Sequence, residues 1–190
     1  MKACFFGLAG LVGGVTVAGG GMIFDVGSGT HEIVAGEVYD YAVARGDAVL
    51  TISGGAIVSS AEYAVSPEEG GAYGPFAASV AGDDAARVII DGGELSGAVL
   101  ALGTSDVWIG PGASAGGYLA NERGTLTIQG TPARGGGAFV EAFGESRVFV
   151  RAGGFAGISV DGATGYVSGG VFDAALVHGF GELEISGGVF

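Results

Sequence analysis

The stretch Val88-Ile89-Ile90-Asp91-Gly92-Gly93 has a shape that recurs along the chain: two apolar residues flank a third position, and a glycine-rich corner follows. The same shape is found at 50–55, 107–110, 126–130, 148–151 and 183–188, with a weaker copy at 165–170. The second apolar residues of these segments, taken as anchors, are Ile52, Ile90, Ile109, Ile128, Val150, Val167 and Ile185. The steps between anchors are therefore 38, 19, 19, 22, 17 and 18 residues, and the first step is twice 19. A fixed period of about 20 residues with short β-type segments is typical of a solenoid.

The glycine corners and the two or three short strands within each period predict an all-β fold, a parallel β-helix. In such a fold one rung is one full turn of the solenoid. Glycine suits the corners because it adopts positive φ without steric cost. Counting the 38-residue step as two rungs predicts about nine rungs of roughly 19 residues over residues 22–190. We expect the winding to be right-handed.

The composition limits the classes of protein to which the chain can belong. Its 190 residues include 42 glycines but only four prolines and show no Gly-X-Y register, which excludes collagen. The hydrophobic share of 48% argues against disorder. The net charge of −13, with only seven Lys and Arg, repels phosphate backbones, so we expect no nucleic-acid partner. A single cysteine, Cys4, and two distant histidines, His31 and His178, give no basis for a disulfide, a metal site or a cofactor.

Residues 1–21 have three interpretations. Lys2 precedes an uncharged stretch that runs to Phe24, and the small residues before residue 19 fit a secretory signal peptide that is cut after Ala18. Residues 15–20 also have the shape of the repeats, which would make them the first rung. A stretch of about 20 apolar residues could instead anchor the chain in a membrane. Beyond such a signal or anchor, we expect no membrane contact.

Period-two alternation assigns a face to each residue of the best strand in every period. The anchors and the residues two before them point inward, so the residues between them point outward. From rung to rung, this outward column contains Thr51, Ile89, Trp108, Thr127, Phe149, Tyr166 and Glu184. Aromatic side chains in a row can stack on sugar rings or anchor a protein partner, but they can equally stabilise the sheet by cross-strand contact. Two arginines flank Phe149 and could grip an acidic sugar. The candidate binding residues are therefore Ile89, Trp108, Phe149, Tyr166, Arg147 and Arg151.

An irregular stretch at 59–86 interrupts the repeats within the 38-residue step, and we interpret it as a distorted rung with an excursion. Insertions in repeat proteins tend to lie on the binding face, so this loop is a second candidate site. Its candidate residues are Tyr63, Glu68, Glu69, Tyr73 and Phe76. The acidic pairs at 68–69 and 83–84 could ligate Ca²⁺ through their oxygens, but such pairs are more often solvated turn residues. We therefore assign no metal site.

Catalysis is the weaker functional hypothesis. β-Helices that cleave polysaccharides need carboxylates that converge on one outer face. Here only Asp91 and Asp106 lie beside the outward column, in diagonal positions. The sequence contains no His-Glu-x-x-His motif, phosphate-binding loop or calcium-binding nonapeptide. We therefore assign no catalytic residue.

The chain resembles the passenger repeats of autotransporter adhesins and related bacterial surface β-helices, which alternate short Val-rich strands with Gly and Gly-Gly corners. The segments that carry the resemblance are 31–38 (HEIVAGEV), 48–58 (AVLTISGGAIV) and 185–190 (ISGGVF). It implies export to the bacterial surface or the exterior, with adhesion or scaffold work there. One departure is that no C-terminal β-barrel follows, and the chain stops at Phe190 directly after a Gly-Gly corner. We therefore expect either a fragment of a longer passenger or an uncapped end that associates end to end with another chain.

Together these observations predict a non-catalytic extracellular adhesin or surface structural protein. Such a protein would bind a glycan or a host-surface protein along one face of the solenoid. The alternative is a polysaccharide-active β-helix, either a lyase or a depolymerase similar to phage tailspikes.

Overall fold

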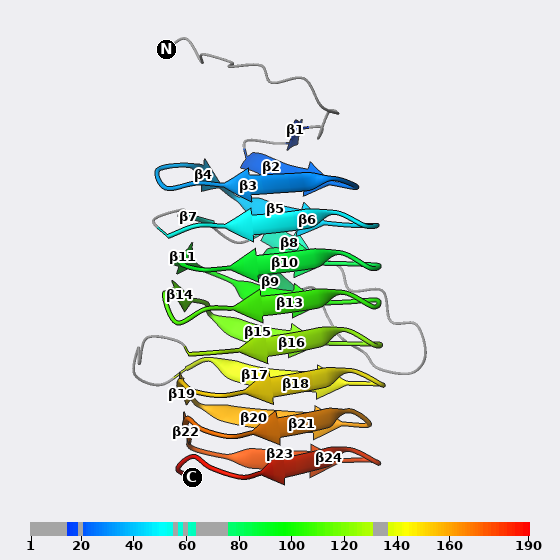
Figure 1. The fold of residues 1–190 in the computed structure, drawn as a ribbon, viewed down its shortest axis with the longest axis vertical. Helices are drawn as coiled ribbons and strands as arrows, with labels where there is room; N and C mark the ends of the chain where they lie inside the picture. The colour runs from blue at the N-terminus through cyan, green and yellow to red at the C-terminus, as the bar shows by residue number, and fades with distance from the viewer. Residues whose placement is uncertain (1–14, 19–20, 55–56, 59–60, 64–75, 131–136) are drawn as a thin grey trace.

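The protein is a parallel β-solenoid whose rungs are stacked from the N-terminal to the C-terminal end (Figure 1). The structure is a computed structural model, and it describes residues 15–18, 21–54, 57–58, 61–63, 76–130 and 137–190. Among these residues the regular structure is entirely β, and no helix in this part of the chain could cross a membrane. The expectation of an all-β parallel β-helix is thus confirmed.

Two large sheets form the two sides of the solenoid, and we call them sheet A and sheet B. Sheet A contains β1 (Val15–Ala18), β2 (Gly21–Val26), β5 (Tyr41–Ala44), β8 (Ala61–Tyr63), β9 (Phe76–Gly82), β12 (Ala98–Ala101), β15 (Gly117–Ala120), β17 (Phe139–Phe143), β20 (Gly157–Asp161) and β23 (Ala175–His178). Sheet B contains β3 (Thr30–Ile33), β6 (Val49–Ile52), β10 (Arg87–Ile90), β13 (Asp106–Ile109), β16 (Thr125–Ile128), β18 (Arg147–Val150), β21 (Thr164–Val167) and β24 (Glu182–Ile185).

Two smaller sheets lie at the corner where the chain passes from sheet B back to sheet A. One contains β4 (Val38–Tyr39), β7 (Ile57–Val58), β11 (Gly93–Leu95) and β14 (Ala113–Ser114). The other contains β19 (Gly154–Phe155) and β22 (Val171–Phe172). All described pairings are parallel except those of β1 with β2 and of β8 with β9.

The apolar anchors predicted from the sequence lie opposite one another in sheet B. Ile90 faces Ile52 on one side and Ile109 on the other, and the same register continues to Ile185. The anchors from Ile52 to Val150 are fully buried, as are the residues two before them, because both point into the solenoid. In the last rung described, Ile185 is about half exposed. The assignment of inward and outward faces is therefore confirmed.

The number of rungs differs from the expected nine. Sheet B has eight strands, which corresponds to about seven turns from the first strand to the last. The 38-residue step is not two rungs, because β10 pairs directly with β6. It is one long rung with an insertion, and a length of twice the period hid this in the sequence.

The insertion is also shorter than the expected span of 59–86. Residues 76–82 form β9, which pairs with both β5 and β12 as a regular member of sheet A. Residues 83–86 form the tight turn that leads into β10, as in other rungs. The irregular part therefore lies between β7 and β9, and within it β8 pairs with β9.

At the N-terminal end, residues 15–18, part of the segment considered as a first rung, do not pair as a rung of the solenoid does. β1 lies antiparallel to β2, whereas successive rungs pair in parallel. The first strand of sheet B is instead β3, whose Ile33 lies opposite Ile52. The repeat pattern misses this strand because His31 stands where most other rungs have Leu or Val.

Small residues are required at the tight turns between sheets A and B, where neighbouring rungs approach closely. The N–H of Gly124 donates to the carbonyl of Asn121 at 2.9 Å to close one such turn. A Cβ atom on Gly124 would overlap the carbonyl group of Ala101 in the preceding rung. Ser105 and Ser146 occupy equivalent positions, where each buried hydroxyl donates to a backbone carbonyl of an earlier rung.

The close approach at Gly124 predicts a stability effect. We expect Gly124→Ala to lower the free energy of unfolding by about 1–3 kcal/mol, because the backbone of two rungs must move apart. Gly27→Ala is the matched control, since a Cβ there meets no atom within 4 Å; its effect should stay within about 0.5 kcal/mol. Urea unfolding followed by circular dichroism measures both, and equal effects would contradict the steric argument.

Candidate binding face

The outward column predicted from the sequence is a continuous line across sheet B. Its predicted members face one another from strand to strand and are Thr51, Ile89, Trp108, Thr127, Phe149, Tyr166 and Glu184. Glu32 of β3, which the sequence analysis did not include, continues the line beyond Thr51. The five from Thr51 to Phe149 are partly exposed, and Tyr166 is 38% exposed. The structure therefore brings the candidate residues Ile89, Trp108, Phe149 and Tyr166 onto one surface, which we call the sheet B face.

Trp108 lies lengthwise along its own strand on this face. A Cβ atom placed on Gly110 would lie 2.9 Å from Cζ3 and 3.0 Å from Cη2 of the indole. The six-membered ring therefore occupies the space that a side chain at position 110 would need. The same Cβ position is 2.9 Å from Oδ1 of Asp91, so the indole and a carboxylate meet above this glycine. Glycine at 110 is what allows Trp108 to lie down on the sheet.

Phe149 and Tyr166 are arranged differently, because they stack on each other. Their ring centroids are 4.9 Å apart and their planes differ by 7°. This separation is close to the spacing of about 4.8 Å between neighbouring strands, so the pair follows the ladder of the sheet. One face of each ring is therefore already in contact with the other ring. Tyr166, at 38%, remains the most exposed of the three aromatic residues of the column, since Trp108 and Phe149 are partly buried.

The charges beside the column are unevenly placed. Arg147 begins β18 and Arg151 follows it, so they lie on either side of Phe149 as the sequence predicted, and both are exposed. Neither has an ion pair or side-chain hydrogen bond to the residues that the structure describes. Nearer the N-terminal end, Arg87 approaches Asp106 with Nε 3.9 Å from Oδ2, a solvent-exposed pair that contributes little energy.

The second candidate, in the insertion, is only partly described. The backbones of Tyr63 and Phe76 lie opposite one another at the ends of β8 and β9. Glu68, Glu69 and Tyr73 lie outside the described residues. Asp84, one of the acids considered for calcium, has its N–H bonded to Oδ1 of Asp83 at 2.8 Å, and its own Oδ2 accepts from the N–H of Gly46. Within the described ranges, no three His, Cys, Asp or Glu residues form a group that could hold a metal ion.

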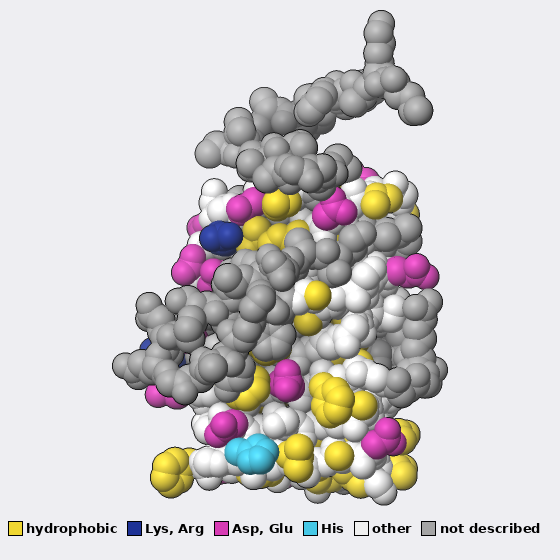
Figure 2. Space-filling view, turned by 180° about the vertical axis from the view of Figure 1, so that it is seen from behind, with side chains coloured by type: hydrophobic (Ala, Val, Ile, Leu, Met, Phe, Trp, Pro, Cys, Tyr) yellow, Lys and Arg dark blue, Asp and Glu magenta, His cyan; other side chains and the backbone are white. Residues whose placement is uncertain are grey.

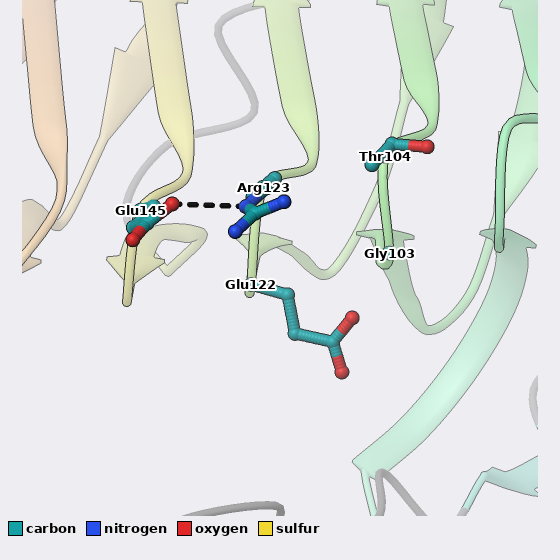
Figure 3. Close-up of a pocket in the computed structure, with 5 residues that line it drawn as sticks. All are labelled: Gly103, Thr104, Glu122, Arg123 and Glu145. Carbon is teal, nitrogen blue, oxygen red and sulfur yellow. Dashed lines mark hydrogen bonds and ion pairs between the residues drawn. The ribbon is translucent and has the colours of Figure 1, made fainter.

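A shallow hollow of about 340 Å³ lies along the tight-turn edge, and the sequence did not indicate it. It is lined by Gly103, Thr104, Glu122, Arg123 and Glu145 (Figure 3). Nε of Arg123 donates to Oε2 of Glu145 at 2.9 Å, and Figure 3 shows Glu122 pointing away from this pair. Both partners are largely exposed, so solvent screens their attraction. With its arginine engaged by Glu145, the hollow offers a ligand less than the sheet B face does.

Comparisons with protein-family models, curated proteins and solved structures gave no match to this chain.

The stacked pair predicts an energetic coupling across the sheet. Phe149→Ala and Tyr166→Ala should each destabilise the fold, and the double variant should lose less than the sum because the stack is lost only once. We expect a coupling energy of about 0.5–1.5 kcal/mol in a double-mutant cycle measured by urea unfolding. Additive effects would mean that the rings merely lie near one another. The pair Thr127→Ala and Tyr166→Ala, two rungs apart, is the control and should be additive.

Proposed function

We propose that this solenoid is a non-catalytic, extracellular or bacterial cell-surface protein that binds a partner along the sheet B face. The observation that carries the proposal is the unbroken outward column in which Trp108 lies along the sheet over Gly110. A rigid sheet holds this side chain in place, so little entropy is lost when a partner binds. We name a glycan as the partner, since an indole on a flat surface suits the apolar face of a sugar ring.

The arginines beside the column add a preference to this proposal. The guanidinium groups of Arg147 and Arg151 are exposed and have no partner for their side chains among the described residues. They lie two rungs from Trp108, in a protein whose net charge is −13. A glycan with carboxylate groups could therefore stack at Trp108 and place an acidic group at the arginines, where Arg binds carboxylates in a bidentate way.

A glycan-array screen of the full chain tests the proposal, with Trp108→Ala beside the wild type. We expect Trp108→Ala to weaken binding by about 1–3 kcal/mol, the usual cost of truncating a central aromatic contact. Thr127→Ala is the matched control, because Thr127 lies next to Trp108 in the same column but has no aromatic ring. Its affinity should stay close to that of the wild type, and circular dichroism checks that both variants fold.

Three outcomes would contradict parts of this proposal. Equal losses in both variants would mean that Trp108 is not the contact. No binding by the wild type would argue against a glycan and favour a protein partner or a structural role. Cleavage of a bound polysaccharide that disappears in Asp91→Asn or Asp106→Asn would establish the enzymatic alternative.

A further inference from the structure

The outer face of sheet A differs in charge from that of sheet B. None of the strands β2, β5, β9, β12, β15, β17, β20 and β23 contains a Lys or an Arg, whereas β10 and β18 of sheet B each begin with Arg. The acids on these sheet A strands are Asp25, Glu141 and Asp161. Figure 2, which shows the molecule from behind, has isolated acidic side chains among apolar ones in the lower half of this face. Arg45, which directly follows β5, forms an ion pair with Asp25 at 3.6 Å, whereas Glu141 and Asp161 form no ion pair with the described residues. A cation that approaches these two acids therefore meets attractive charges and no arginine on the strands.

A depression of about 320 Å³ lies on this face. Ala98 and Gly117, which are opposite one another on β12 and β15, line it with a methyl group and bare backbone. Leu119, Phe139 and Glu141 also line it. Phe139 is 49% exposed, and its ring covers Gly157 on the next strand, where a Cβ atom would lie 3.0 Å from Cε1. The depression therefore combines an apolar lining, an exposed aromatic ring and one carboxylate.

Glu141 is the charged group in this lining. Its side chain is half-buried, and it makes no hydrogen bond or ion pair with the residues that the structure describes. Leu119 and Ser159 face it from the neighbouring strands, and Phe139 and Phe143 lie two residues away on its own strand. The only charged residue on those neighbouring strands is Asp161, which is also negative. Loss of hydration raises the pKa of the Glu141 carboxyl group. A positively charged ligand at this position would therefore stabilise the ionised form of the Glu141 carboxyl group.

We propose that the depression around Glu141 binds a lysine or arginine side chain of a protein partner. The carboxylate of Glu141 would pair with the ammonium or guanidinium group. The apolar stem of the ligand would lie on Gly117 and Leu119, and Phe139 would contact the cation through its ring face. This site is on the opposite side of the solenoid from the sheet B face, so it does not depend on the function proposed above.

The test uses a short alanine peptide with one central lysine, and the same peptide with norleucine as the neutral probe of similar shape. Nuclear magnetic resonance of the labelled full chain follows the amide signals of Gly117, Phe139 and Glu141 during each titration. We expect the lysine peptide to shift these signals saturably. Glu141→Gln should weaken its binding by roughly five- to thirtyfold, between the effects at exposed and at buried charge pairs.

Two further variants separate the site from general attraction to an acidic protein. Asp161→Asn removes the same charge from the same face outside the depression and should leave lysine-peptide binding within about twofold. Gly117→Val should block binding by filling the depression, since a Cβ at 117 meets its nearest atoms at an ordinary 3.8 Å and the fold can accept it. Three results would each overturn the proposal. The lysine and norleucine peptides could bind equally, Glu141→Gln and Asp161→Asn could lose equal affinity, or the amide signals of Gly117, Phe139 and Glu141 could fail to shift.

The raised pKa of Glu141 also predicts how stability depends on pH. A carboxyl group whose pKa is higher in the folded state binds protons more tightly there, so its contribution to stability falls as the pH rises through the folded pKa. Glu141→Gln removes this penalty. We expect its melting temperature to exceed that of the wild type at about pH 7, with the difference shrinking as the pH falls towards the ordinary pKa of a glutamate, about 4. A difference that persists unchanged at low pH would show that ionisation is not its cause.

Discussion

The parallel ladder of backbone hydrogen bonds between successive rungs determines where every other residue lies. In sheet B the N–H of Arg87 donates to the carbonyl of Ala48, and the N–H of Asp106 donates to that of Ala86, both at 2.9–3.0 Å. The ladder pairs equivalent residues of neighbouring rungs, so side chains line up in columns. A slip of one residue would turn every apolar column outward, and burial of the anchors therefore fixes the register.

The same ladder explains why the rungs can differ in length. It constrains the strands and the tight turns, where a Cβ at Gly124 would meet the rung before it. It does not constrain the chain between β7 and β9, so an insertion there leaves Ile52 and Ile90 in register. After the insertion, β9 pairs with β12 with a register shift between Ala98 and Val99. Extra residues in a loop add little closure entropy, and the solenoid accommodates them.

The fold could be predicted from the sequence because inward positions must be apolar in every rung, and Ile or Val at a fixed spacing records that requirement. The number of rungs could not be predicted, since a step of twice the period fits two regular rungs as well as one long rung with an insertion. The aromatic stack of Phe155, Phe172 and Phe190, with centroid distances of 5.0 and 5.2 Å, was also not predicted, because it lies outside the strand with the clearest repeat.

At the candidate site, the outward column of sheet B was predictable from the alternation of inward and outward residues. The position of Trp108 over Gly110, the stacking of Phe149 on Tyr166 and the depression at Glu141 depend on side-chain directions that no period encodes.

Residues in the outer columns take no part in the backbone ladder, so each face can change its chemistry without changing the fold. Sheet B has Arg87 and Arg147 on its strands, with Arg151 just beyond. The described sheet A strands have no Lys or Arg, and Arg45, just beyond β5, is paired with Asp25. Packed sheets are about 10 Å apart, which is near the screening length of physiological salt, so a ligand responds mainly to the charges of the face it touches. An acidic glycan and a basic side chain would therefore be sorted to opposite sides of one solenoid. Since the backbone is common to both faces, this sorting rests entirely on the outward residues, and exchanging charges between the two columns should exchange the ligands.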